Sequence, residues 1–541
     1  MAESLQKSDD ILAMQKDGND IEQAVDADPE PEEKDNDLVT VATRASERLP
    51  FSKVRSIALV ATVAAAPFLT TFNTQASVIT LPTIGEALDI PTSRQQWIVS
   101  AYNLTFGCFL LLWGRLADIY GRRLIFLWGS TCFTAFAIVT PFIPNEIGFD
   151  VVRGLAGLAA AALFPTALGI LGTTFPAGKA KDVAFGAFGA AAPLGGVIGN
   201  IFGGVVSEYL DWKWVFWICG MFSAVTTLAG FFVIPLPPIQ AEPSMRNTVD
   251  WIGGTLITIA LIIMLFALSE GNVVGWRTPW VPTLIVVSVI IVLVFGWWQH
   301  YLETKTEKRP LMKMSIFNNR NFMWVNVLMA LFFSSFNNFL IYATYWFQDY
   351  QGLSVIQTTL RFIPTGATGF FVAFLTGHLL SSVRGDYMLI FSTLCVGISS
   401  LLFAIAIPEH TTYWAYGFPA MVLSVCGADT LFPVLTLFVA KTLPPEDASL
   451  GGALITAVGQ IGRSIGLAIV TAVQTGILAK EKGVSVERVG NEGYNSQHWD
   501  EALKLSIRGA AWFNFGIGVA STIVVVFFVR GIGIIGGKGK R

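Results

Sequence analysis

Apolar runs, each long enough to cross a lipid bilayer, recur from Val54 to Val529 of this 541-residue chain. A helix needs about 20 mainly apolar residues to cross the hydrocarbon core. No single soluble core could bury so many runs. Only 13% of the residues are charged, against roughly 25% in soluble proteins. The sequence therefore predicts an all-α membrane protein with many spans.

We predict fourteen spans from these runs. Proline and glycine near the ends blur several boundaries, and helix tilt changes the length that a span requires. The fifth and thirteenth spans are both rich in glycine and both follow a short basic loop, which indicates two similar six-span halves with two extra spans between them. The spans lie near 56–85, 97–117, 124–143, 150–174, 183–207, 214–236, 251–269, 280–302, 322–347, 355–380, 388–407, 414–440, 450–478 and 510–530.

The first 40 residues hold thirteen Asp or Glu against three Lys, a composition typical of a solvated, disordered tail. No short apolar segment with a cleavage site precedes the first span, so that span itself must direct insertion. Lys and Arg are concentrated in alternate short loops, which by the positive-inside rule places both termini in the cytoplasm. The predicted parts are an acidic cytoplasmic tail, an amino-terminal half, two extra helices, a carboxy-terminal half and a cytoplasmic tail, at 1–50, 51–236, 251–302, 322–530 and 531–541.

Ten residues between the second and third spans, 114–123, carry three arginines, one aspartate and two glycines. Charged groups are excluded from hydrocarbon, so this segment predicts a tight polar hinge at one membrane face, with glycines that permit the turn. Asp118 could pair with arginines across the loop or with the positive end of a neighbouring helix, in a contact that breaks when the halves rearrange. A plain positive-inside anchor is the alternative. The predicted gate residues are Gly114, Arg115, Asp118, Gly121, Arg122 and Arg123.

This hinge resembles the signature loop between spans 2 and 3 of the major facilitator superfamily, and residues 96–102 resemble its 14-span drug/proton antiporter branch. Further similar motifs lie at 150–157, 211–216 and 459–466. With the acidic tail, the chain looks like fungal members, some associated with resistance to toxic compounds and others with small solutes such as borate or ammonium. The resemblance implies a major facilitator fold that binds a small-molecule substrate and protons within the lipid bilayer.

Two ionisable residues are predicted for the proton or substrate path. Arg153 lies near the start of the fourth span, where a charge normally faces a water-filled cavity or a partner. Asp429 is the carboxylate nearest the middle of a span, where an ionisable group indicates function. Each has a plainer explanation. Arg153 could extend to the outer surface as an anchor, and Asp429 could pair with a helix end or a polar neighbour.

The first span departs from the related antiporters. The resemblance places Asn73 where those proteins have an acidic residue, a short distance before Leu81 and Pro82. An amide cannot carry a proton, which puts proton coupling through this position in doubt. Asn73 and Gln75 are assigned to the same path, because their amides could bond either to a substrate or to neighbouring helices.

The fifth span carries glycines at spacings of three and four around a proline. Small residues at such spacings let two helices approach closely, and a proline removes one backbone hydrogen bond. The stretch resembles the antiporter motif of span 5, although Ala192 replaces the glycine that commonly precedes the proline. Helix packing alone is the alternative explanation. The predicted motif comprises Pro193, Gly195, Gly196 and Gly199.

Asn338 and Tyr342 share one face of the ninth span with Tyr345, because helical residues four and seven apart lie on the same side. Amide and phenol groups on one face could line a cavity, so Asn338 and Tyr342 are predicted to contact the substrate. Aromatic residues also gather at membrane interfaces, an explanation that suits Trp346 better.

Other kinds of chemistry are not indicated. No glycine-rich loop ends in Gly-Lys-Ser or Gly-Lys-Thr, which argues against ATP-driven pumping. The four histidines and five cysteines show no metal-ligand or disulfide spacing. We predict no enzymatic activity, no metal, no cofactor and no nucleic-acid partner.

The sequence therefore predicts a monomeric secondary active transporter, in the plasma membrane rather than the vacuolar membrane, that exports small organic or toxic compounds by proton exchange. Two alternatives stay open. One is an uncoupled facilitator of a small solute such as ammonium or borate, which Asn73 favours. The other is a membrane sensor that does not transport and signals through its tail.

Overall fold

The structure is a computed structural model that describes residues 51–90, 95, 97–176, 178–236, 249–276, 278–306, 310–405, 411–444, 447–484, 499–529 and 532–535. The structure described below lies within the unit Pro50–Arg541. The predicted acidic tail at 1–50 lies outside the described residues, as does most of the predicted tail at 531–541.

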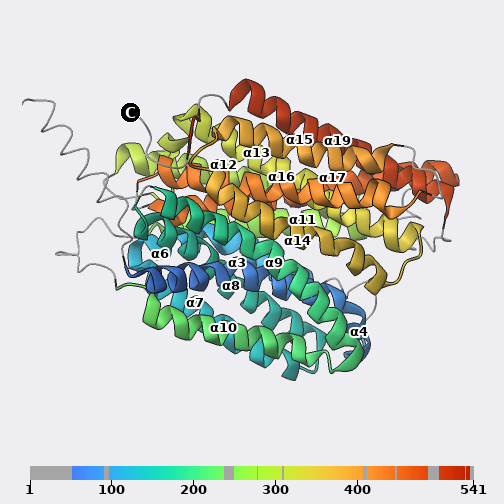
Figure 1. Ribbon diagram of the computed structural model, residues 1–541, viewed down its shortest axis with the longest axis horizontal. Coiled ribbons are helices and arrows are strands. Elements are labelled where there is room, and N and C mark those ends of the chain that lie inside the picture. Colours follow the sequence, from blue (N-terminus) through green and yellow to red (C-terminus); the bar gives the residue numbers. More distant parts are fainter. Residues whose placement is uncertain are drawn as a thin grey trace, which may run out of the picture. The chain divides into compact units, whose positions relative to one another are not determined.

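Fourteen helices in the described part of the chain are long and apolar enough to cross a membrane, which confirms the predicted number. Figure 1 shows them as long helices that lie side by side. They are α3 (Lys53–Ile79), α6 (Trp97–Tyr120), α7 (Arg122–Val139), α8 (Glu146–Thr174), α9 (Lys179–Tyr209), α10 (Lys213–Val233), α11 (Trp251–Val274), α12 (Trp280–Lys305), α13 (Arg320–Tyr345), α14 (Val355–Leu379), α15 (Gly385–Ala404), α16 (Tyr413–Thr442), α17 (Ala448–Lys482) and α19 (Glu501–Phe528).

The first span is shorter than predicted. Helix α3 ends at Ile79, and a separate short helix, α4 (Leu81–Ala87), follows it. A proline stands in the first turn of α4, where a missing N–H group costs no helical hydrogen bond. The Leu-Pro pair that we assigned to the end of the first span therefore begins a new helix.

The two six-helix groups repeat one packing pattern. In the first group α8 packs against α6 and α7, and α3 packs against α9 and α10. Between the groups, α9 contacts α14, and α17 contacts α6. The fifth helix of each group thus lies against the second helix of the other. This reciprocal arrangement is the one expected from two similar halves.

The two extra helices are joined by a polar network at one end. The Asp250 carboxylate accepts hydrogen bonds from the Gly253 N–H (2.9 Å), the Trp298 indole (3.1 Å) and the Gln299 amide (2.6 Å). The Gln299 side-chain amide oxygen, Oε1, accepts a hydrogen bond from the Met312 N–H at 3.1 Å. These contacts hold the start of α11, the end of α12 and the chain that enters the second half together.

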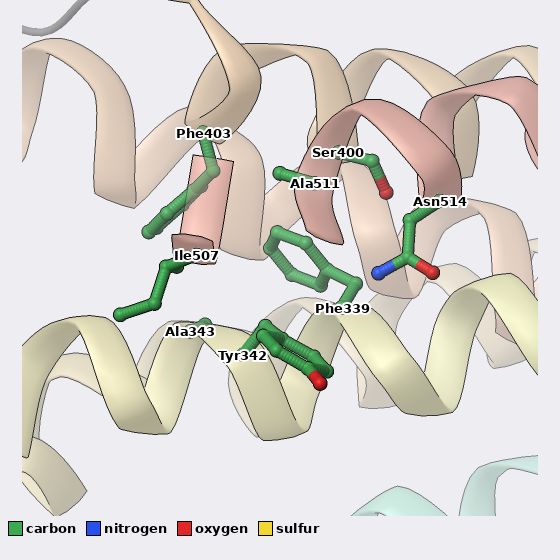
Figure 2. Close-up of a pocket in the computed structure, with 8 residues that line it drawn as sticks. All are labelled: Phe339, Tyr342, Ala343, Ser400, Phe403, Ile507, Ala511 and Asn514. Atoms are coloured by element: carbon green, nitrogen blue, oxygen red, sulfur yellow. The ribbon is translucent and has the colours of Figure 1, made fainter. Parts of the chain in front are cut away.

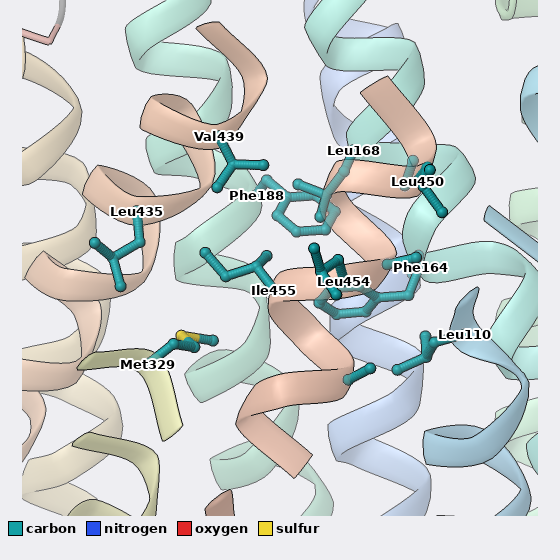
Figure 3. Packing of buried hydrophobic residues seen from close by; sticks show 14 of the residues in the cluster. Leu110, Phe164, Leu168, Phe188, Met329, Leu435, Val439, Leu450, Leu454 and Ile455 are labelled. Carbon is teal, nitrogen blue, oxygen red and sulfur yellow. The ribbon is translucent and has the colours of Figure 1, made fainter. Parts of the chain in front are cut away.

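One end of the bundle is called the Asp118 end. Helices α6 and α8 end there, and helices α7, α9 and α17 begin there. Near this end, apolar side chains from both halves form one buried cluster (Figure 3), which we call the apolar plug. Removal of these apolar groups from water stabilises the contact between the halves at this end. The plug comprises Leu110, Phe164, Leu168, Phe188, Met329, Leu435, Val439, Leu450, Leu454 and Ile455.

The described residues 532–535 return to the Asp118 end of the second half. The Ile532 N–H donates to the Asp386 carboxylate at the start of α15, at 3.0 Å. The Lys441 ammonium group at the end of α16 donates to the Ile535 carbonyl. This part of the predicted carboxy-terminal tail is therefore held against the helices.

Candidate functional site

Asp118, the predicted gate aspartate, contacts both halves. Its carboxylate accepts hydrogen bonds from the N–H groups of Ser449 (3.2 Å) and Leu450 (2.9 Å), in the first turn of α17. Arg122 donates to the same carboxylate, the shorter bond being 2.7 Å, and the Asp118 side chain is 1% exposed. A carboxylate at a helix amino terminus binds free N–H groups and meets the positive end of the helix dipole. Asp118 therefore has both partners that the sequence suggested.

The other two hinge arginines bind different helices. The Arg115 guanidinium donates to the Asp447 carboxylate at 2.9 Å, and both side chains are buried. The Lys313 ammonium lies 3.5 Å from the other Asp447 oxygen. Arg123 instead donates to the Phe231 carbonyl at the end of α10, at 2.6 Å. Arg115 thus joins the halves, whereas Arg123 acts within the first half.

Asp447 was missed by the sequence reasoning. It lies at the amino-terminal boundary of α17, immediately before a long apolar run. An acidic residue in that position is a signal for the start of a helix, and this signal could have identified it. Its charge partners on α6 and before α13 could not be read from the sequence, since they are remote along the chain.

The hinge itself is shorter than predicted. Helix α6 continues through Tyr120, so Gly114 makes no turn. A Cβ atom on Gly114 would lie 2.7 Å from the Ala453 Cβ and 3.0 Å from the Ser449 carbonyl, which shows that the glycine permits close approach of α17. Gly121 alone makes the turn, with φ of +102°, a conformation that favours glycine.

Arg153 is bonded to Asn73, the residue at which the first span departs from the antiporter pattern. Its guanidinium donates to the Asn73 amide oxygen at 3.0 Å and to the Ile98 carbonyl at 2.8 Å. It also lies over the rings of Tyr102 and Phe216, at 5.1 and 5.3 Å. Since Arg153 is only 1% exposed, the alternative of an anchor at the outer surface is wrong.

Two glycines of the span-5 motif pack against α3. A Cβ atom on Gly199 would lie 2.7 Å from the Phe72 carbonyl, and one on Gly195 would overlap the α3 backbone. The Thr71 hydroxyl donates to the Ala192 carbonyl at 2.7 Å, which joins the helices directly. These contacts support the helix-packing explanation for both glycines.

Gln75 and Gly196 lie across the same helix contact. Gln75 is half-buried on α3, and its Cγ lies 3.9 Å from the position that a Cβ on Gly196 would take. This is an ordinary van der Waals distance. The structure therefore brings Gln75 to the span-5 motif.

Asp429 lies where α16 meets α14 and α9. It is 8% exposed, and its Oδ2 atom has no hydrogen-bond partner among the described residues. A Cβ on Gly369 of α14 would lie 2.5 Å from this oxygen and 3.0 Å from the Pro193 Cβ of α9. A carboxylate of one half and the motif proline of the other thus flank one glycine. Burying an unpartnered charge is costly, so this geometry favours a protonated carboxyl group.

Asn338 and Tyr342 are both buried. The Tyr342 hydroxyl donates to the Gln474 side chain at 3.2 Å, and the Asn338 amide has no hydrogen-bond partner among the described residues. Figure 2 shows Tyr342 beside a pocket between α13, α15 and α19, with polar groups from Ser400 and Asn514. The pocket volume of about 10 Å³ holds one water molecule, not an organic compound. This pocket does not provide the substrate cavity predicted for the two residues.

Trp346 is also buried, at 2% exposed, and its indole N–H donates to the Tyr416 hydroxyl at 3.1 Å. Trp346 directly follows the last residue of α13, at one end of the ninth span, and packs there inside the protein. Among the described residues, no three His, Cys, Asp or Glu side chains come together as a metal site would require. Asp118, Arg115 and Arg153 bind helices to one another instead.

Fourteen membrane-length helices, two repeated groups in reciprocal contact and a polar contact between them define a membrane transporter built from two halves. The chain belongs to the major facilitator superfamily, whose family model matches residues 63–467.

Similar proteins include a low affinity ammonium transporter from Saccharomyces cerevisiae, 30% identical over 83% of this chain and 87% of that protein. The efflux pump terG from Aspergillus terreus is 26% identical and covers 88% of each chain. Among solved structures, the human organic anion transporter MFSD10 has a TM-score of 0.62 at 13% identity, over 87% of this chain and 99% of that one. At that identity the likeness supports the fold alone.

Proposed function

We propose that this transporter exports small organic or toxic compounds in exchange for protons. The observation that carries the proposal is the bond between Asp118 and the first turn of α17, because it makes a breakable lock between the halves. The similarity to an efflux pump supports export as the direction. In this proposal the protein acts as a monomer without an enzymatic step or a cofactor.

The transport cycle would open and close the Asp118 end. With Asp118 bonded to α17 and Arg115 bonded to Asp447, the apolar plug keeps the halves together. Opening this end requires that both polar contacts break and that the plug separates. Asp429, which lies between helices of both halves, would take up a proton from water on the outer side of the membrane and release it to water on the cytoplasmic side after the halves rearrange.

An uncoupled facilitator of a small solute such as ammonium or borate is the second candidate. Asn73 carries no proton, and its bond to Arg153 keeps a neutral amide where related antiporters have an acid. The similarity to an ammonium transporter favours the same alternative. A sensor that does not transport is less well supported, since its only sequence feature is the acidic tail.

Expression of the full chain in a drug-sensitive yeast strain should raise the inhibitory concentration of at least some toxic compounds. Flux in reconstituted vesicles, with and without an imposed pH gradient, then tests proton coupling. Unchanged sensitivity to every compound, with the protein present at the cell surface, would contradict export. Ammonium or borate flux that ignores the gradient would favour the facilitator.

We also propose that both termini face the cytoplasm and that the protein lies in the plasma membrane. The sequence predicted loops at 303–321 and 479–509, but α12 ends at Lys305, α13 begins at Arg320, α17 ends at Lys482 and α19 begins at Glu501, so the connections are shorter, 306–319 and 483–500. The positive-inside rule places the first inside and the second outside. A protease added to intact cells should cleave an epitope tag in 483–500 and leave one in 306–319 untouched. Cleavage at 306–319 with the cells still sealed would reverse the topology.

A further inference from the structure

Arg463 of α17 is a charged residue that the gate does not use. Its guanidinium lies over the Phe333 ring of α13, 4.7 Å from the ring centre. The residue is half-buried, and its Nε atom has no hydrogen-bond partner among the described residues. None of the ion pairs found among those residues includes Arg463. The buried Nε–H of this cation therefore lacks a hydrogen-bond acceptor within the described part of the chain.

Arg463 lies near the middle of its span. It is about 22 Å beyond the first residue of α17, at 1.5 Å per residue, in a bilayer core about 30 Å thick. Asp429 is about 20 Å from the end of α16, and these two helix ends adjoin at the Asp118 end. The two charges therefore lie at similar depths on separate helices. At this depth an arginine is costly unless it faces a cavity or a partner.

The side of α17 that carries Arg463 lies where α17 contacts both α8 of the first half and α13 of the second. A Cβ atom on Gly452 would lie 2.8 Å from the Leu168 side chain of α8, so this side of α17 points toward the first half. Arg463 follows Gly452 by about three helical turns and Gly459, which packs on Met329 of α13, by about one. It therefore lies between the side of α17 that meets α8 and the side that meets α13. Gly462, one residue earlier, packs on the α13 backbone, which leaves Arg463 directed past α13 toward the space between the halves.

The ring under Arg463 belongs to a chain of aromatic contacts between the halves. Phe333 meets Phe432 of α16 at 6.1 Å between ring centres, and Phe432 meets Phe164 of α8 at 6.3 Å. Phe164 is part of the apolar plug. Arg463 thus lies at the plug's inner boundary, where a compound between the halves would meet one cation beside an apolar aromatic surface.

We propose that Arg463 binds the carboxylate, or a comparable acceptor group, of the transported compound, whose apolar part packs on Phe333. A guanidinium forms strong paired hydrogen bonds with a carboxylate, and in a water-poor site it disfavours an organic cation at the same place. The transported compounds would then be organic acids and other acceptor-bearing molecules. This inference rests on the proposed transport function.

Counterflow in proteoliposomes tests the proposal with two probes of similar size and opposite charge, benzoate and benzyltrimethylammonium, after subtraction of protein-free vesicles. The wild-type protein should exchange benzoate, and Arg463→Gln should reduce that exchange by about tenfold, as expected for loss of a charge-assisted hydrogen bond. Arg463→Lys should keep part of it. The matched control is Arg508→Gln, since Arg508 lies within a span but donates to the Ala404 carbonyl, and it should exchange benzoate as the wild type does.

Equal benzoate exchange by wild type and Arg463→Gln would overturn the proposal. Preference of the wild-type protein for benzyltrimethylammonium over benzoate would also overturn it. Export of other compounds without any benzoate exchange would overturn it as well. In these two cases the proposed transport function would still hold. If no compound in the toxicity panel is exported and neither probe is exchanged, the transport function itself fails. Surface expression of Arg463→Lys separates loss of binding from loss of folding.

Discussion

Asp118→Ala is expected to slow transport by at least about tenfold while the protein still reaches the membrane. The substitution removes the acceptor for two N–H groups of α17 and leaves the Arg122 guanidinium without its carboxylate. Breaking a buried charged contact costs about 3–5 kcal/mol, and 1.4 kcal/mol already changes an equilibrium tenfold. The state closed at the Asp118 end should therefore lose most of its population. Flux per molecule at matched surface expression measures the effect.

Glu501→Ala is the matched control for this substitution. Glu501 also lies in the first turn of a helix and also pairs with a basic residue, Lys504, but its side chain is 62% exposed. An exposed pair contributes little, so flux should be near the wild-type value. Arg115→Ala, which removes the second contact between the halves, should slow transport in the same direction as Asp118→Ala. Normal flux in both gate variants would refute the lock.

The helices were predictable because their signal is local. Each span is a continuous apolar run, and the chain supplied fourteen of them, as the structure confirms. The boundary between α3 and α4 was misplaced because the apolar run continues across it. The sequence also predicted which types of group Asp118 would contact, an arginine and a helix amino terminus. A carboxylate at the end of a span has few other stabilising neighbours.

Contacts between distant segments could not be predicted in this way. Gly114 was read as a turn because glycine permits turns, yet its role is to let α17 approach, and only the packing shows that. The ion pair between Arg115 and Asp447 joins residues far apart in the chain. The side of α17 that carries Arg463 likewise became clear only when Gly452 was found against α8.

Asp429→Asn is expected to abolish accumulation driven by a pH gradient while leaving counterflow without a gradient measurable. Asparagine preserves the shape of the side chain beside Gly369 but cannot release a proton. Counterflow requires only substrate exchange and a working conformational cycle, so its survival separates lost coupling from lost binding. Both fluxes are measured in proteoliposomes with the same protein content. The control is Asp211→Asn. The Asp211 side chain is 51% exposed, and this substitution removes only its ion pair with the Lys213 ammonium group, which lies 3.8 Å away.

The burial of Asp429 explains why its substitution should affect proton coupling and not substrate exchange. An unpartnered carboxyl group between two halves is neutral while it is shielded and can ionise when water enters, so one residue can couple a proton to the rearrangement. Asn73 cannot do this, because its amide neither takes up nor releases a proton while it accepts the hydrogen bond from Arg153. If wild-type flux ignores an imposed gradient, after correction for ionisation of the substrate, the facilitator replaces the antiporter. If wild type and Asp429→Asn respond equally to the gradient, the proton passes elsewhere, and the surroundings of Arg153 become the next site to test.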